Sequence, residues 1–191
     1  MDEQWVVMEC DEAEIARLAG EAGISPVLAR ILLNRSIATP EAVRDFMDPA
    51  LASLHDPFLL PDMDRAVARL AAAVSGGELI CVHGDYDVDG VTGAALLVRT
   101  LKALRANVDY RLPHRRNEGY DIKAATVEEL AARGVRLIVT CDCGIGAIEA
   151  VQKANELGVD VIVTDHHEPG AVLPAAVAVV NPKRRDASYP F

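Results

Sequence analysis

The stretch Val135-Arg136-Leu137-Ile138-Val139-Thr140 is an apolar run of strand length, and residues 144–157 after it have the apolar spacing of a helix. The same alternation recurs on both sides. Further strand-like runs lie at 79–82, 108–112, 159–164 and 177–180, and further helical segments at 91–105 and 122–133. Alternating strands and helices predict an α/β fold, with a doubly wound, mainly parallel five-stranded sheet flanked by helices.

Residues 1 to about 75 have helical spacing and are interpreted as a short helical lead-in. Asp11 and Glu14 have the spacing of a capping box, and Thr39 with Pro40 supplies a cap and a proline at the first helical position. We therefore expect a helical N-terminal segment at 1–75 and an α/β domain at 76–191. Because the chain ends without a terminal helix or a polar tail, we expect this domain to be truncated at its C-terminus.

The composition is that of a chain that can bury a core but lacks a general nucleic-acid-binding charge. Of its 191 residues 51% are apolar, and the formal net charge is −10. The four cysteines are too few for a disulfide framework and indicate thiols in a reducing compartment. No apolar run reaches the roughly 18 residues of a membrane span, and no signal peptide is recognisable. We expect a soluble, cytoplasmic protein without membrane contact.

Acidic residues follow three of the predicted strands: Asp85, Asp142 and Asp165. In doubly wound sheets, ligands bind outside the carboxyl ends of the strands. At the first of these places, His83-Gly84-Asp85-Tyr86-Asp87-Val88-Asp89 carries a metal-ligand type at every second position, so an extended backbone would project all four to one side. An acidic surface turn and an EF-hand loop are competing interpretations, but an EF-hand loop would need glutamate where Leu96 stands.

The second place is Cys141-Asp142-Cys143-Gly144, where glycine leaves room for a ligand near the start of the next helix. A zinc thiolate site is an alternative. In a strand, however, Cys141 and Cys143 would face away from Asp142, so two core-packed thiols are the better interpretation. The third place, Asp165-His166-His167, puts two imidazoles beside a carboxylate that can orient them. Oxygen ligands with a few imidazoles favour divalent-metal phosphoryl chemistry.

These three motifs resemble motifs I, II and III of the DHH phosphoesterase superfamily. The sequences of the stretches 54–61, 84–90 and 181–184 are similar to those of the RecJ family of single-strand-specific 5′ exonucleases. This resemblance extends over nearly the whole chain. It implies a hydrolase with two Mn²⁺ or Mg²⁺ ions that removes nucleotides from the 5′ end of single-stranded DNA in repair and recombination. Single-stranded DNA and DNA-repair proteins are the implied partners.

The resemblance also implies roles for individual residues. The implied metal ligands are His83, Asp85, Asp87, Asp89, Asp142 and His166. His83 and Asp87 would hold one ion. Asp89 and His166 would hold the other. Asp142 would bridge the two ions, and Asp85 would ligate or support them.

The remaining implied roles concern the substrate. His167 would contact the scissile phosphate or assist the leaving group, and Asp165 would orient the histidines. Contacts to the DNA backbone are expected from one of two basic runs, although a solvated basic face explains either run equally well. The first run comprises Arg111, Arg115 and Arg116, and the second Lys183, Arg184 and Arg185.

Two features depart from the family pattern. A fourth acidic motif and a second domain are not among these residues, so we expect the fragment alone to be nearly inactive. Asp121 stands where glycine is common. Two alternative functions stay open: a phosphoesterase of oligonucleotides, cyclic dinucleotides or pyrophosphate, and a non-catalytic replication scaffold. Intact ligand residues argue against the scaffold, and the helical lead-in argues against the small-substrate enzyme.

Overall fold

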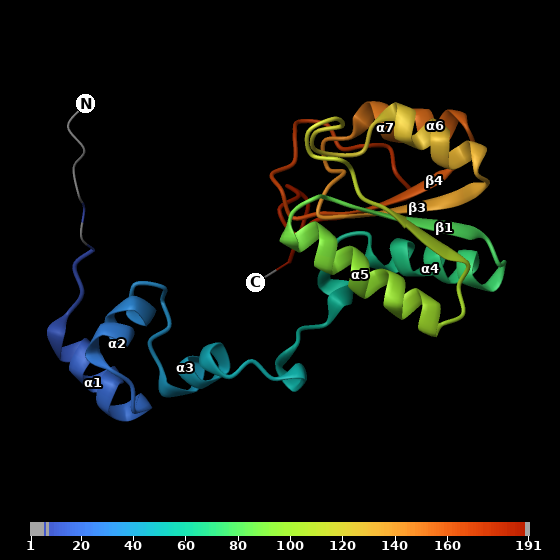
Figure 1. Cartoon of the computed structure of the whole chain (residues 1–191). Helices are drawn as coiled ribbons and strands as arrows, with labels where there is room; N and C mark the ends of the chain where they lie inside the picture. Colours follow the sequence, from blue (N-terminus) through green and yellow to red (C-terminus); the bar gives the residue numbers. More distant parts are fainter. Residues whose placement is uncertain (1–5, 7, 190–191) are drawn as a thin grey trace, which may run out of the picture. The chain divides into compact units, whose positions relative to one another are not determined.

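The computed structural model describes residue 6 and residues 8–189, and it divides into two compact units, Met1–His55 and Asp56–Phe191 (Figure 1). The first unit contains three helices, α1 (Glu12–Ala22), α2 (Pro26–Leu33) and α3 (Pro40–Met47), followed by the short 3-10 helix η1 (Leu51–Ser53). The predicted cap at Thr39 is confirmed, because its side chain accepts a hydrogen bond from the amide of Ala42. The helices enclose a small core of Ile15, Leu18, Ala29, Leu32 and Val43.

The second unit is the predicted α/β fold. Its helical elements are η2 (Pro57–Leu59), α4 (Met63–Ser75), α5 (Val88–Ala103), α6 (Ala124–Ala132) and α7 (Ile148–Glu156). Its strands are β1 (Leu79–Gly84), β2 (Val108–Arg111), β3 (Val135–Cys141), β4 (Asp160–Thr164) and β5 (Ala178–Val180). They form one five-stranded sheet in the order β2-β1-β3-β4-β5, with every pair parallel. The fold class is therefore confirmed.

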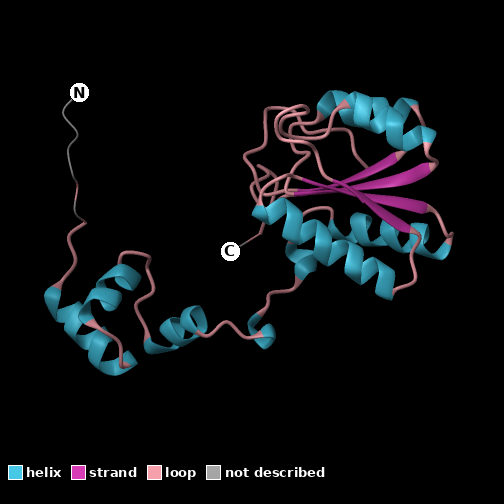
Figure 2. Ribbon diagram, viewed as in Figure 1, coloured by secondary structure: helices cyan, strands magenta, loops and turns pink. Residues whose placement is uncertain are grey.

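Helices cover both faces of the sheet, α4 and α5 on one and α6 and α7 on the other (Figures 1 and 2). Alternate residues of a strand point to opposite faces. Within β3, Ile138 accordingly belongs to the core under α6 and α7, whereas Leu137 and Val139 belong to the core under α4 and α5. No helix among the described residues is long and apolar enough to cross a membrane.

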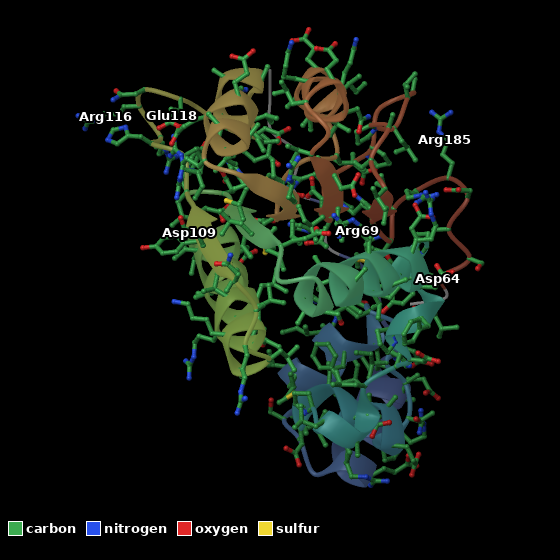
Figure 3. The ribbon with its side chains drawn as sticks, turned by 90° about the vertical axis from the view of Figure 1, so that its right-hand side faces the viewer. Asp64, Arg69, Asp109, Arg116, Glu118 and Arg185 are labelled. Carbon is green, nitrogen blue, oxygen red and sulfur yellow. The ribbon has the colours of Figure 1, made fainter. Side chains whose placement is uncertain are left out.

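Helix α4 belongs to the α/β unit, so the observed division falls at residue 55 and not at the expected residue 75. Ala66 and Ala73 of α4 are buried in the core under the sheet. Arg69 also donates to Asp160 at 2.5 Å and to Glu78 at 2.6 Å, which connects α4 to the amino ends of β4 and β1 (Figure 3). Helical periodicity marks α4 as a helix but does not say which core it covers.

Candidate metal centre

The three acidic residues that follow the strands lie side by side at one edge of the sheet. The amide of Asp85 donates to the carbonyl of Cys141, the amide of Asp142 to Thr164, and the amide of Asp165 to Val180. Each bond extends the parallel ladder by one residue beyond the strands. The chain order reverses between β1 and β3, which is where doubly wound sheets bind ligands.

The first motif is extended only as far as Asp87, because helix α5 begins at Val88. Asp87 is the N-cap of α5, and its Oδ1 accepts hydrogen bonds of 3.0 Å from the amides of Asp89 and Gly90. These bonds, first of all that from Gly90, lower the pKa of Asp87. The expectation of an extended backbone through all four ligand types is therefore wrong after Asp87, because Asp89 lies exposed in the first helical turn.

Glycine lets α5 begin this close to β1. A Cβ atom on Gly90 would lie 2.5 Å from the nitrogen and 2.6 Å from the oxygen of the Asp85 main chain. A Cβ atom on Gly84 would lie 2.6 Å from the carbonyl oxygen of Gly90. Because both positions lack a side chain, the carboxylates of Asp85 and Asp87 come together at the carboxyl end of β1.

The second motif turns at Asp142, whose φ of +64° ends β3. Cys143 therefore lies beyond the end of β3, where its Sγ lies 3.7 Å from His83 Nδ1 and donates to the His83 carbonyl at 3.6 Å. Burial raises the pKa of Cys143, and it raises that of Cys141 to about 11. Both side chains are therefore thiols near pH 7 in the metal-free protein. Cys143 is buried in the core, Cys141 is partly buried, and neither belongs to a cluster of metal-ligand atoms among the described residues.

Asp165 organises the third motif through its buried carboxylate. Its Oδ1 accepts hydrogen bonds from the amides of His166 at 2.7 Å and His167 at 3.1 Å, and it lies 2.7 Å from His167 Nδ1. The other oxygen accepts from the amide of Ile145 at 3.0 Å. The bond to Asp165 raises the pKa of His167. Asn181 adds a further support, because its side-chain amide donates to the His167 carbonyl at 2.9 Å.

Two clusters of metal-ligand atoms share one residue. Within each cluster all the ligand atoms lie within 4.8 Å of one another. The first comprises Asp85, Asp87 and Asp142, and the second Asp142, His166 and His167. His166 Nε2 lies 2.9 Å from Asp142 Oδ1, although the angles are not those of a hydrogen bond. Because the Asp142 carboxylate belongs to both clusters, it is placed to bridge two metal ions.

The residues present fit hard divalent cations. Asp85 Oδ1 is buried without a hydrogen-bond partner in the described part of the chain, which costs free energy unless something else pairs with it. Burial, followed by the nearby Asp87, raises the pKa of Asp142. Carboxylates that repel one another are relieved by a cation. The donor set, mostly carboxylate oxygen with some imidazole, suits Mn²⁺ or Mg²⁺.

His83 and Asp89 lie outside both clusters, as far as the described residues show. The side chain of His83 is buried, and burial lowers its pKa to about 4, with the positive charge of Arg111 as a further cause. The imidazole is therefore neutral near pH 7, which is the form that binds metals. Ligation by His83 and by Asp89 stays a prediction.

The two basic runs differ in how far their cations are already engaged. Arg111 pairs with Glu118 at 2.6 Å and donates to the Leu112 carbonyl at 2.7 Å. The guanidinium of Arg115 lies 4.9 Å from the ring centroid of Tyr86, which belongs to the first motif. Arg116 lies on the loop beside Glu118, on the opposite side of the α/β unit from Arg185 (Figure 3).

In the second run, Arg184 is a structural residue. Its side chain is only 10% exposed and bonds to Asp62 at 2.7 Å, to the Val179 carbonyl at 2.6 Å and to Asp186 at 2.7 Å. Lys183 lies 3.1 Å from Glu168. The second run therefore offers fewer unengaged cations to a phosphate backbone than its sequence suggests.

Sequence reasoning missed Tyr120, whose hydroxyl lies 3.1 Å from His167 Nδ1. The available signal was its neighbour Asp121, which stands where the resemblance led us to expect glycine. Asp121 has a φ of +72°, a left-handed conformation that glycine adopts without strain, and its Oδ1 accepts from the amide of Ile122 at 2.8 Å. This turn places Tyr120 beside the third motif.

Comparison with known proteins identifies the family of the chain. The DHH family, N-terminal domain, matches residues 79–189, and the chain therefore belongs to the DHH family. Among curated proteins it is similar to the single-stranded-DNA-specific exonuclease RecJ. Identity is 39% over 188 residues to the protein of Bacillus subtilis, covering 98% of this chain and 24% of that protein. Identity to the protein of Escherichia coli is 38% over 170 residues, covering 88% and 29%.

Solved structures give the same neighbours. RecJ of Thermus thermophilus in complex with Mn²⁺ matches with a TM-score of 0.70 and 34% identity, over 92% of this chain and 24% of that one. An exonuclease RecJ bound to manganese matches with a TM-score of 0.65 and 41% identity, over 70% and 34%. The chain spans only about a quarter of the length of the first two curated relatives, as their covered shares of 24% and 29% show.

Proposed function

We propose that this chain supplies the metal centre of an Mn²⁺- or Mg²⁺-dependent exonuclease that degrades single-stranded DNA from its 5′ end. The observation that carries the proposal is the place of Asp142 in both ligand clusters, at the carboxyl edge of the sheet. The relatives support it, because they carry the name of single-stranded-DNA-specific exonucleases and two related structures hold manganese.

In this proposal Asp85, Asp87 and Asp142 hold one ion, while Asp142 and His166 hold the second. His83 and Asp89 complete the ligand set on the ground of the motif resemblance alone. The chemistry that two divalent ions supply when bound is a lowered pKa of a shared water and neutralisation of charge on the phosphate oxygens.

His167 is proposed to act on the substrate. Its Nδ1 lies against Asp165, so Nε2 is the nitrogen left to face a phosphate or a leaving oxygen. Because Asp165 raises the pKa of His167, the imidazole holds a proton more readily than a free histidine and can present it to the leaving group. Asp165 itself accepts hydrogen bonds and keeps the ring in place.

DNA is proposed to reach the site past the first basic run. Arg115 is exposed and lies over Tyr86 next to Asp85 and Asp87, so its charge can pair with a phosphate close to the clusters. Arg116 and the partly engaged Arg111 would add weaker contacts. With a net charge of −10, binding should weaken steeply as salt increases. We further propose that the protein acts in repair and recombination together with DNA-repair proteins, in the cytoplasm.

A chimera tests the proposal. Residues 1–191 replace the matching segment of Bacillus subtilis RecJ, and Mn²⁺-dependent release of nucleotides is measured on 5′-labelled single and double strands. We expect release from single strands that Asp142→Asn abolishes, with the parent enzyme as the positive control. A folded chimera that releases nothing, or that keeps its activity with Asn at position 142, would overturn the proposal.

A further inference from the structure

Tyr120 connects the second motif to the third. It lies on the loop between β2 and α6, and its hydroxyl is 3.4 Å from the carbonyl of Asp142 and 3.1 Å from His167 Nδ1. The two rings also pack edge to face, with centroids 5.5 Å apart and an interplanar angle of 70°. One side chain thus contacts the backbone of the residue shared by both clusters and the imidazole proposed to act on the substrate.

Donor and acceptor rules define the direction of these bonds. The carbonyl of Asp142 can only accept, so the single proton of the Tyr120 hydroxyl points toward it. The hydroxyl oxygen is then an acceptor toward His167 Nδ1, which also faces Asp165 at 2.7 Å. Two acceptors thus share the proton on Nδ1. This arrangement leaves Nε2 as the nitrogen available to substrate.

The loop that carries Tyr120 is anchored on both sides of it. Glu118 accepts from the amide of His114 at 3.1 Å and pairs with Arg111 at the end of β2. On the other side, the left-handed turn at Asp121 is closed by its bond to the amide of Ile122, a buried core residue. Anchors of this kind fix the position of a side chain that is itself 38% exposed.

We propose that Tyr120 is a positioning residue, which fixes the imidazole of His167 against Asp165 and relative to the main chain of Asp142. Its effect on hydrolysis rests on the function proposed above, but the contact itself does not. Removing the hydroxyl should take away one of the two hydrogen-bond acceptors of His167 Nδ1. The fold should be undisturbed, because phenylalanine keeps the edge-to-face packing.

The direct test is nitrogen-15 NMR of the histidine rings in the metal-free chain, comparing wild type with Tyr120→Phe. We expect the Nδ1 proton of His167 to exchange with solvent about tenfold faster in the variant, as follows from losing one hydrogen bond. Tyr110→Phe, at an exposed tyrosine of β2, is the matched control and should leave the exchange unchanged. Amide spectra report whether each variant is folded. Unchanged exchange in folded Tyr120→Phe would refute the inference.

Kinetics of the chimera supply the second readout. A positioning role predicts that Tyr120→Phe lowers kcat about tenfold and leaves KM nearly unchanged, since the ring orientation matters in the transition state and not in strand binding. A rise in KM with constant kcat would show that Tyr120 binds DNA and would also refute the inference. If the chimera with Tyr120 intact were inactive, the proposed function would fail, while the NMR measurement would still decide whether Tyr120 positions His167.

Discussion

His166 Nε2 lies 2.9 Å from Asp142 Oδ1, so the third motif reaches back to the second across the edge between β3 and β4. The parallel register makes this contact possible, because the amide of Asp142 bonds to the carbonyl of Thr164, the last residue of β4. A residue that is isolated in the sequence thereby becomes part of two clusters. The effect of replacing Asp142 on metal binding is therefore the most direct test of the proposed centre.

Gly90 sets the distance between α5 and β1, and Gly90→Ala should destabilise the protein. The added Cβ would lie 2.5 Å from a main-chain atom of Asp85, which cannot move aside without separating the helix from the strand. We expect a loss of about 2 to 3 kcal/mol in the free energy of unfolding, measured with urea.

Gly146→Ala is the matched control for this substitution. Its Cβ would meet only Asp121 Oδ2 at the ordinary distance of 3.7 Å, so the expected change is under about 0.5 kcal/mol. Equal effects at the two positions would show that close packing at Gly90 does not matter.

Arg184 is expected to stabilise the fold, and its exposed neighbour Arg185 is not. Arg184→Met would leave Asp62 without its buried cation and the Val179 carbonyl without a donor, at a cost of about 2 kcal/mol. Arg185→Met should change the free energy of unfolding by less than about 0.5 kcal/mol. Urea denaturation of both variants distinguishes this structural role from DNA contact. Full stability of Arg184→Met would contradict the structural role.

His83 should make the metal-free protein less stable as the pH falls. Its pKa is about 4 when folded and 6.5 ordinarily, so between these values the unfolded chain binds a proton that the folded chain excludes. Stability is complete above the ordinary pKa and decreases until the folded pKa is reached. The expected loss from this residue is about 2 kcal/mol between pH 7 and pH 5.

The measurement is the difference in unfolding free energy between wild type and His83→Asn at each pH, with exposed His114→Asn as the control. His167, whose pKa is raised by Asp165, acts with the opposite sign: its stabilisation is lost as the pH rises through the raised pKa. It is common to both proteins and cancels in the difference. A difference that is independent of pH would contradict the assignment of a buried, neutral His83.

The sheet and the edge where the site lies were predictable because apolar runs such as 135–140 and the acids after them are local signals. The start of α5 was not. Its apolar periodicity begins near Val91, but the cap at Asp87 starts the helix at Val88 and thereby places Asp89 in the first helical turn. Periodicity reports the buried face of a helix, whereas capping sets its first residue.

Tertiary contacts explain the other differences. The orientation of Cys143 depends on the left-handed backbone at Asp142, a conformation that a strand-like sequence does not indicate. The position of α4 depends on the contacts of Arg69 with residues before and within strands β1 and β4. The function of Arg184 depends on Asp62, which is distant in the sequence. None of these features can be predicted from hydrophobic periodicity or from a sequence motif.

Calorimetric titration of the metal-free chain with Mn²⁺, for wild type and Asp142→Asn, tests the central claim most directly. The shared carboxylate predicts saturable Mn²⁺ binding by wild type and at least a tenfold weaker affinity, about 1.4 kcal/mol, in the variant. Asp64→Asn, at an exposed acid of α4, should bind as wild type does. Equal Mn²⁺ affinity in wild type and Asp142→Asn would contradict the account.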